Sequence, residues 1–328
     1  MRRAFMLCLL LLPMLLSAAG HASPASSGPD MRVVLLGTAG GPVIRSDRVG
    51  IGTLVLAGDQ VLLFDVGRGV PGELQRVPVR PAAVSVVFLT HLHSDHLAGI
   101  PELYLFPWAS EGRRTPFRIQ GPGGTRAMME HLQAAFAYDI HVRRDIDEHF
   151  PAEGIAVEAT DIEPGVVYEA DGVKVTAFLV DHSPIEPAYG YRIDYRGRSV
   201  VLSGDTRPTP NLVKFAKGAD LLIHEVGRWK DDPALEGDPD ELLPNSLTRQ
   251  QIRVIAEHHT DPVEAGDVFA QARPRLAVFS HYAMAGDDIM SLVRRQYAGR
   301  VEVGQDGMVI EIGDEVRVRA PDPAPGNG

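Results

Sequence analysis

Three histidines and one aspartate lie within six residues, directly after an apolar stretch of the chain. The motif HLHSDH occupies residues 91–96 and follows the β-branched run 84–89. Because side chains two residues apart on an extended chain point the same way, His91 and His93 are expected to face one point. The aspartate and the third histidine lie on the turn that follows and can fold back towards it. Neutral imidazoles and a carboxylate suit zinc or a similar first-row metal, so this motif predicts a metal site.

The same kind of junction recurs along the chain: an apolar run ends, and a histidine or an aspartate follows within two residues. It occurs at His91, His182, Asp205, His224 and His281. In α/β proteins the loops at strand ends gather along one edge, where ligand sites form. We therefore expect seven metal ligands at one place: His91, His93, Asp95, His96, His182, Asp205 and His281. Seven donors are too many for one tetrahedral ion and favour two ions that share a carboxylate and activate a bridging water.

Length and composition indicate a soluble globular protein with a sizeable core. The chain has 328 residues, of which 45% are hydrophobic and 23% charged. Its 43 acidic and 32 basic side chains give a formal net charge of −11. An acidic protein lacks long-range attraction to phosphate backbones, and no dense run of lysine and arginine occurs. The composition therefore disfavours a nucleic-acid partner.

The first residues have the features of a secretion signal. Residues 1–23 combine Arg2 and Arg3, an apolar run over 4–16 and small residues before the end. The apolar run is too short to span a bilayer comfortably, so no membrane span is expected after the signal is cleaved. The only cysteine, Cys8, lies in this segment, which leaves the mature chain without a disulfide or a thiolate ligand. These features predict a periplasmic or secreted protein.

The rest of the chain divides into a linker, one α/β domain and a tail. Residues 24–30 are expected to be a polar linker, residues 31–320 the domain, and the proline- and glycine-rich residues 321–328 a disordered tail. Hydrophobic periodicity predicts strands and helices in alternation. Strands are expected at 31–36, 52–57, 61–65, 191–195, 199–202, 221–225 and 276–280, and helices at 125–138, 248–257 and 263–272.

Two further features lie where the first predicted strands end. The glycine-rich segment 37–42 lacks the Lys-Ser/Thr ending of a P-loop and the GxGxxG spacing. It favours a tight turn that lets the backbone approach the site. Asp65 ends another strand, where its carboxylate could orient a metal-binding histidine or serve only as a turn residue.

The order and spacing of these residues resemble the metallo-β-lactamase fold superfamily. The resemblance rests on the HxHxDH motif at 91–96, followed in order by His182, Asp205 and His281. Shorter matches resemble the ribonuclease Z and arylsulfatase-like branch: Leu36-Gly37-Thr38, Asp65-Val66-Gly67, Ser203-Gly204-Asp205-Thr206, His224-Glu225 and His259-Thr260. The resemblance covers almost everything from residue 31 to residue 281. It implies a four-layer αββα sandwich, in which two β-sheets lie face to face with helices outside.

The resemblance also implies roles for the predicted ligands. It implies two zinc ions, although histidine and carboxylate ligands leave another divalent metal open. One ion would be held by His91, His93 and His182, and the other by Asp95, His96 and His281. Asp205 would bridge the two ions.

The same branch uses a histidine outside the ligand set to protonate the leaving group, oriented by a glutamate. Here these residues would be His259 and Glu225, with the neighbouring His258 as the alternative acid. The sequence after residue 259 favours His259. Together with Asp95, they are the expected catalytic residues.

One departure from the branch concerns the substrate. Ribonuclease Z enzymes that cut tRNA precursors carry an arm between the third-histidine motif and the bridging aspartate. Here His182 and Asp205 are only 23 positions apart, and a predicted hairpin fills the interval. We therefore expect an exported dinuclear zinc hydrolase that cleaves a phosphodiester, a sulfate ester or a related ester in a small-molecule substrate. The alternatives are a lactonase or β-lactamase-type acyl hydrolase and a non-catalytic metal-binding protein. A homodimer is compatible with the sequence.

Overall fold

The computed structural model describes residues 28–243 and 247–319. The predicted signal peptide, residues 24–27 of the predicted linker and the predicted tail 321–328 lie outside the described residues. In the described ranges, no helix is long and apolar enough to cross a membrane. The predicted domain boundaries at residues 31 and 320 stay predictions.

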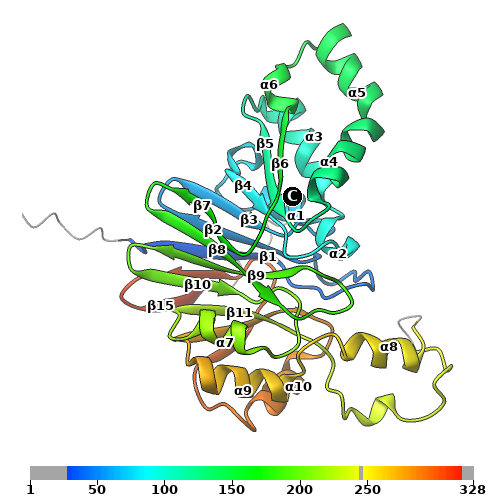
Figure 1. Cartoon of the computed structure of the whole chain (residues 1–328), viewed down its shortest axis with the longest axis vertical. Helices are drawn as coiled ribbons and strands as arrows, with labels where there is room; N and C mark the ends of the chain where they lie inside the picture. Colours follow the sequence, from blue (N-terminus) through cyan, green and yellow to red (C-terminus); the bar gives the residue numbers. More distant parts are fainter. Residues whose placement is uncertain (1–27, 244–246, 320–328) are drawn as a thin grey trace, which may run out of the picture.

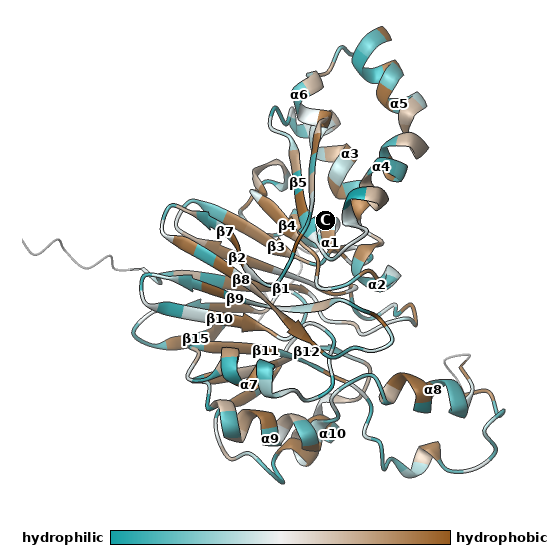
Figure 2. Ribbon diagram, in the orientation of Figure 1, coloured by the Kyte–Doolittle hydropathy of each residue, from teal (hydrophilic) through white to brown (hydrophobic). Residues whose placement is uncertain are grey.

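Strands with two apolar faces build the centre of the protein. In strand β1 (Met31–Gly37), Val33 and Leu35 are buried on one face, and Val34 and Leu36 on the other. A strand buried on both faces belongs in a sheet that is covered on both sides. Two such sheets form the middle layers of the molecule, and Figure 2 shows hydrophobic residues concentrated on strands such as β12.

The first sheet has eight strands in the order β15-β14-β1-β2-β3-β4-β5-β6. Its other strands are β2 (Gly52–Ala57), β3 (Gln60–Phe64), β4 (Val86–Phe88), β5 (Phe117–Gly121), β6 (Val157–Asp161), β14 (Val309–Ile312) and β15 (Val316–Arg319). Strands β3 to β6 pair in parallel. The segments that follow β3 and β4 therefore emerge at the same edge of the sheet, and these segments carry Asp65 and the HxHxDH motif.

The second sheet has seven strands in the order β13-β12-β11-β10-β9-β8-β7. They are β7 (Gly165–Ala170), β8 (Val173–Val180), β9 (Ala188–Tyr195), β10 (Arg198–Leu202), β11 (Leu221–Val226), β12 (Leu276–Tyr282) and β13 (Val301–Val303). Strands β10 to β13 pair in parallel, and β8 runs in the same direction because β9 is antiparallel to both β8 and β10. His182, Asp205 and His281 therefore lie at one edge.

Helices cover the outer face of each sheet (Figure 1). The first sheet packs its outer side chains on α3, including the buried Leu103, and the second on α7, α9 and α10, including the buried Phe269. The result is the predicted αββα sandwich. The helices are α1 (Val70–Leu74), α2 (Ser94–Leu97), α3 (Ile100–Glu111), α4 (Thr125–Ala135), α5 (Ala137–His141), α6 (Ala152–Ile155), α7 (Pro210–Ala216), α8 (Arg249–Ala256), α9 (Pro262–Ala272) and α10 (Gly286–Val293), with short η1 (Pro81–Ala83), η2 (Val142–Ile146) and η3 (Pro233–Leu235).

One helix differs from its prediction. The segment 125–138 was expected to form a single helix, but the chain leaves helical geometry at Phe136, where φ is −103° and ψ is 12°. Helix α4 therefore ends there, and α5 continues in a new direction. Figure 1 shows α5 above α4 at the upper right.

A long excursion leaves the second sheet after β11 and returns at α9. We call residues 227–243 and 247–258 the α8 excursion; Figure 1 shows it at the lower right. Helix α8 begins with a capping box between Thr248 and Gln251. The excursion is tied to the body at both ends, because Lys230 Nζ lies 2.8 Å from the Glu264 carboxylate and Arg207 donates to the carbonyl of Glu257 at 2.6 Å.

Candidate metal centre

The first two histidines of the motif converge directly after β4. His91 is fully buried, and its Nε2 lies 2.9 Å from Nδ1 of His93. His93 precedes α2 with an extended backbone, at φ −70° and ψ 145°. This extended geometry keeps the two side chains on one side, as the two-residue spacing predicts.

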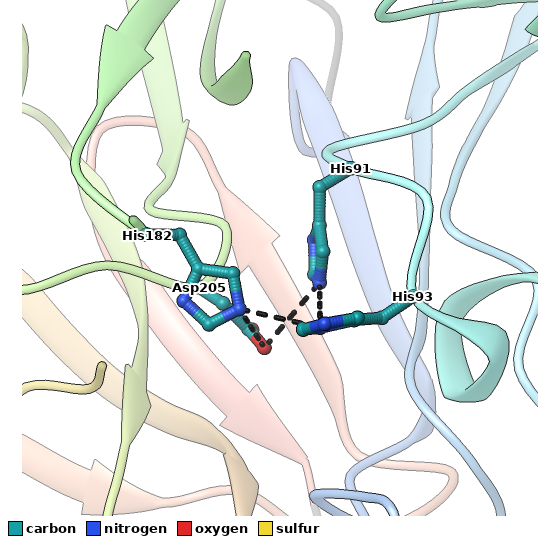
Figure 3. Close-up of side chains that lie close together, drawn as sticks. All are labelled: His91, His93, His182 and Asp205. Carbon is teal, nitrogen blue, oxygen red and sulfur yellow. Dashed lines mark hydrogen bonds and ion pairs between the residues drawn. The ribbon is translucent and has the colours of Figure 1, made fainter. Parts of the chain in front are cut away.

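Two donors from the second sheet complete this group (Figure 3). Nε2 of His182 lies 3.3 Å from Nδ1 of His93, and Asp205 Oδ2 lies 3.8 Å from Nε2 of His91. All four donor atoms lie within 4.8 Å of one another. Ligands around a tetrahedral zinc ion, with bonds near 2.0–2.1 Å, lie roughly 3.3 Å apart, so the spacing of these donors fits one ion.

A second group lies beside the first. Nε2 of His96 lies 3.3 Å from Nε2 of His281 and 3.6 Å from Asp95 Oδ2. Asp205 lies between the groups, because its Oδ2 is 3.4 Å from His96 Nε2 and its Oδ1 is 3.4 Å from Nδ1 of His281. The structure thus brings all seven predicted ligands together. Their individual roles, including the catalytic role of Asp95, stay predictions.

Hydrogen bonds behind the cluster orient its side chains. Asp65 Oδ2 accepts from Nδ1 of His96 at 2.9 Å, which turns Nε2 of that ring towards the other donors. The remaining oxygen of Asp65 accepts from the backbone N–H of Thr90 at 2.9 Å. Of the two alternatives for Asp65, this geometry supports the orienting one. On the other side, Nδ1 of His182 donates to the carbonyl of His258 at 3.0 Å.

The glycine-rich turn reaches the cluster through its backbone. The N–H of Gly41 donates to Asp95 Oδ2 at 3.1 Å. A Cβ at position 41 would lie 2.2 Å from that oxygen, so only glycine fits there. The turn therefore brings the backbone to the site, as predicted, and steadies one of the proposed ligands.

The electrostatics of the cluster suit metal ions. Burial lowers the pKa of His91, His93 and His182, which keeps these imidazoles neutral. Burial alone would raise the pKa of Asp205, but the surrounding imidazoles outweigh it and hold the pKa well below its usual range. Burial alone would lower the pKa of His96. The charges of Asp205 and two further carboxylates outweigh burial, so the pKa of His96 is raised. Neutral imidazoles and ionised carboxylates are the forms that bind metals, so His96 would release its proton when an ion binds.

A histidine–glutamate pair lies next to the cluster. Glu225 Oε2 accepts from Nδ1 of His259 at 3.1 Å, and its other oxygen accepts from the backbone N–H of Thr260 at 2.8 Å. The ring of His259 lies 5.1 Å from the ring of His182. Burial alone would lower the pKa of His259, but Glu225 outweighs it and raises the pKa to about 9. The geometry thus leaves His259 protonated beside the cluster.

The two other candidate histidines point elsewhere. His224 precedes Glu225 on β11, and alternate side chains on a strand face opposite sides, so its ring packs on Phe269 of α9 at 5.5 Å. His258 is half-buried, and its Nδ1 faces the carbonyl of Ser183 at 2.5 Å. His259 is therefore the member of its pair that the structure brings beside Glu225.

The sequence interpretation missed the residue that holds the Thr38–Val49 loop over the cluster. Asp306 accepts from Oγ1 of Thr38 at 2.7 Å and from the backbone N–H of Val49 at 2.6 Å. Its signal in the sequence is weak: a carboxylate next to a glycine in a turn, 257 positions from Val49. No local pattern reports such a distant contact.

Comparison with protein families and relatives identifies the group to which this geometry belongs. The family model described as Beta-lactamase superfamily domain matches residues 61–282. A ribonuclease Z from Mycobacterium marinum (strain ATCC BAA-535 / M) is 35% identical over 291 residues, which cover 86% of this chain and 99% of that protein. A ribonuclease Z from Mycobacterium avium (strain 104) is 36% identical over 285 residues, which cover 84% and 96%.

Solved structures show the same fold. The metallo-β-lactamase fold protein YhfI from Bacillus subtilis matches with a TM-score of 0.64 at 22% identity, covering 85% of this chain and 98% of that chain. Human tRNase Z, short form, matches with a TM-score of 0.63 at 21% identity, covering 86% and 99%. The predicted αββα fold is confirmed, as is the prediction of a metal-dependent hydrolase acting on phosphodiester bonds. The fold and the seven donors together indicate a dinuclear metal site.

The predicted partner class is wrong. We expected a small-molecule ester and no nucleic acid, whereas the relatives are ribonucleases, which act on RNA. The error has a physical reason: the net charge of −11 describes the whole chain, while binding depends on charge near the site. Arg45 and Arg68 line a hollow that reaches Asp95, so the local charge differs from the average.

The predicted localisation is also wrong. We expected a periplasmic or secreted protein, but ribonuclease Z homologues are cytoplasmic. That prediction rested on residues 1–23, which lie outside the described part of the chain. The sulfate-ester part of the predicted function also finds no support among these relatives.

Proposed function

Because the chain belongs to the metallo-β-lactamase fold superfamily, in its ribonuclease Z branch, we propose that it is a dinuclear zinc phosphodiesterase that cleaves RNA. The observation that carries the proposal is the convergence of seven donor atoms beside His259, whose Nδ1 is hydrogen-bonded to Glu225. Histidine and carboxylate ligands are a donor set that zinc uses in catalytic sites. Two bound ions would supply an activated water near neutral pH and neutralise charge that develops on the phosphoryl oxygens.

The seven proposed ligands would be divided between the two ions. His91, His93 and His182 would hold one ion, and Asp95, His96 and His281 the other, with Asp205 between them. His91 is almost inaccessible, whereas His93 and Asp95 are partly exposed, so a phosphate would approach from their side. The buried donors behind it would keep their geometry because each is hydrogen-bonded or packed.

His259 would act as the general acid. When the phosphorus–oxygen bond to the leaving group breaks, the leaving oxygen takes the proton from Nε2 of His259, while an oxygen from water bonds to phosphorus. Glu225 would position the acid, because it accepts from Nδ1 of His259 and so leaves Nε2 for the substrate. The bonds from Thr260 and Thr206 to the same carboxylate keep Glu225 in place.

The test is hydrolysis of a 3′-extended tRNA precursor and of an aryl phosphodiester by zinc-loaded protein. The native protein should cleave both substrates, and His93→Ala should abolish both activities and lower the bound zinc. His141→Ala, which changes an exposed histidine far from the cluster, is the matched control and should behave as native. Full activity in His93→Ala, or zinc-loaded native protein that cleaves neither substrate, would contradict the proposal.

A further inference from the structure

A groove opens next to His259, between the Gly40–Arg45 loop and the α8 excursion. His259 and His281 line it. One wall belongs to α8, through Ile252, Ile255 and Ala256, and the other to the loop, through Pro42 and Val43.

Two guanidinium groups complete the lining of the groove. Arg45 lies on the loop side and Arg228 at the start of the α8 excursion. Each guanidinium already pairs with a carboxylate, Arg45 with Asp47 and Arg228 with Asp232. About a third of each side chain stays exposed, however, and can meet a phosphate in the groove.

The position of the groove relative to His259 indicates which side of the scissile bond the groove faces. His259 lines the groove together with His281, whereas His91, His93 and His182 do not. An acid that protonates the leaving oxygen must lie on the leaving-group side of the scissile bond. The groove is therefore on that side.

We propose that this groove, which we call the α8 groove, binds the nucleotide on the leaving-group side of the scissile phosphodiester. The inference rests on the proposed function. The nucleobase, which is flat and has apolar faces, lies against Ile252 and Ile255. Arg228 contacts the sugar–phosphate of the same nucleotide. A purely apolar occupant would leave the exposed parts of the two guanidinium groups without an anionic partner, and a free phosphate would leave the isoleucines uncovered.

The experiment removes a nucleobase from the substrate and, separately, the side chain of Ile255 from the groove wall. The scissile bond of an RNA is first mapped with native zinc-loaded protein; the fragment with the new hydroxyl end is the leaving side. One abasic residue is then placed next to the scissile bond, on the leaving side or on the other. For the native protein, the leaving-side abasic residue should raise KM roughly tenfold, as loss of a base contact does. The abasic residue on the other side should have a much smaller effect.

The protein variant Ile255→Ala completes a double-mutant cycle with the abasic substrate. In Ile255→Ala the KM of intact RNA should rise, and base removal should then change KM by less than about twofold, because the contact is already lost. Val254→Ala is the matched control, since this neighbouring side chain is 48% exposed on the same helix and lies outside the groove lining. Binding of an RNA whose leaving oxygen is replaced by methylene, measured by fluorescence anisotropy, should show the same pattern in Kd.

The outcomes separate the two proposals. Cleavage of RNA with equal sensitivity to base removal in native protein and Ile255→Ala would overturn the α8 groove and leave the proposed function intact. The same holds if the abasic residue matters only on the other side. Absence of RNA cleavage by the zinc-loaded native protein would overturn the proposed function and this inference with it.

Discussion

The proton on His259 depends on one carboxylate. Burial alone would lower the pKa of His259, and Glu225 raises it to about 9 through a hydrogen bond of 3.1 Å and the charge behind it. The oxygens of Glu225 accept hydrogen bonds from His259 and from the backbone of Thr260, so this carboxylate positions the acid. The two residues thus have distinct roles, which a pH profile separates.

We predict that the kcat of the native protein falls as pH rises through the pKa of His259, because the acid is active only when protonated. Glu225→Gln removes the charge that raises this pKa, so the alkaline limb should move to lower pH. His258→Ala is the control and should keep the native limb. The measurement is kcat from pH 6 to pH 10 on a substrate with a poor leaving group. An unchanged limb in Glu225→Gln would show that Glu225 does not position the acid.

At the scale of elements, the Thr38–Val49 loop connects the cluster to both hollows around it. Its Gly41 N–H holds Asp95, its Arg45 lines both hollows, and Asp306 binds both of its ends. The loop has no regular structure beyond isolated bridges, so its shape depends on these few contacts. Loops of this kind unfold locally at low cost when their anchors are removed.

We predict that Asp306→Ala loosens this loop without unfolding the protein. Backbone amides between residues 38 and 49 should exchange with deuterium faster, and KM for RNA should rise roughly fivefold, because a lost buried hydrogen bond costs about 1 kcal/mol. Zinc content should stay near native. Glu315→Ala, an exposed carboxylate in the turn between β14 and β15, is the control. Exchange at native rates would show that Asp306 does not hold the loop.

The ends of strands were predictable from the sequence because the relevant signals are local. An apolar run followed by histidine or aspartate located His91, His182, Asp205 and His281 correctly. The same pattern misplaced His224, because β11 continues for two residues beyond it and strand alternation turns its ring away. The pattern depends only on how soon a residue follows an apolar run. The side of the sheet that its side chain faces depends on where strand pairing ends.

The α8 groove was not predictable for a different reason. Its walls come from residues 40–45 and from the α8 excursion, which are about 200 positions apart in the chain. Helix α8 itself was expected near its observed bounds, since Thr248 and its amphipathic spacing are local signals. That Ile255 faces a loop across the sheet edge depends on tertiary packing alone.

At the scale of the whole molecule, the metal centre joins the two sheets. The four proposed ligands in the HxHxDH motif follow β4 of the first sheet, and the other three, His182, Asp205 and His281, belong to the second. The unfolded chain cannot hold these donors in one place, so ions that bind here stabilise the folded state. The net charge of the chain does not predict this coupling between metal binding and folding, just as it did not predict the partner.

We therefore predict that removal of metal weakens the contact between the sheets. With free zinc at a hundred times its Kd, each of the two ions should contribute about 2.7 kcal/mol. Chelation should thus lower the Tm by roughly 5–10 °C for a domain of this size. In Asp205→Ala, which removes the carboxylate between the two groups, the gain in Tm on adding zinc should shrink to a small part of the native gain. The measurement is calorimetry of each protein with zinc and with chelator. An equal gain in both would mean that zinc stabilises the protein from a site other than this cluster.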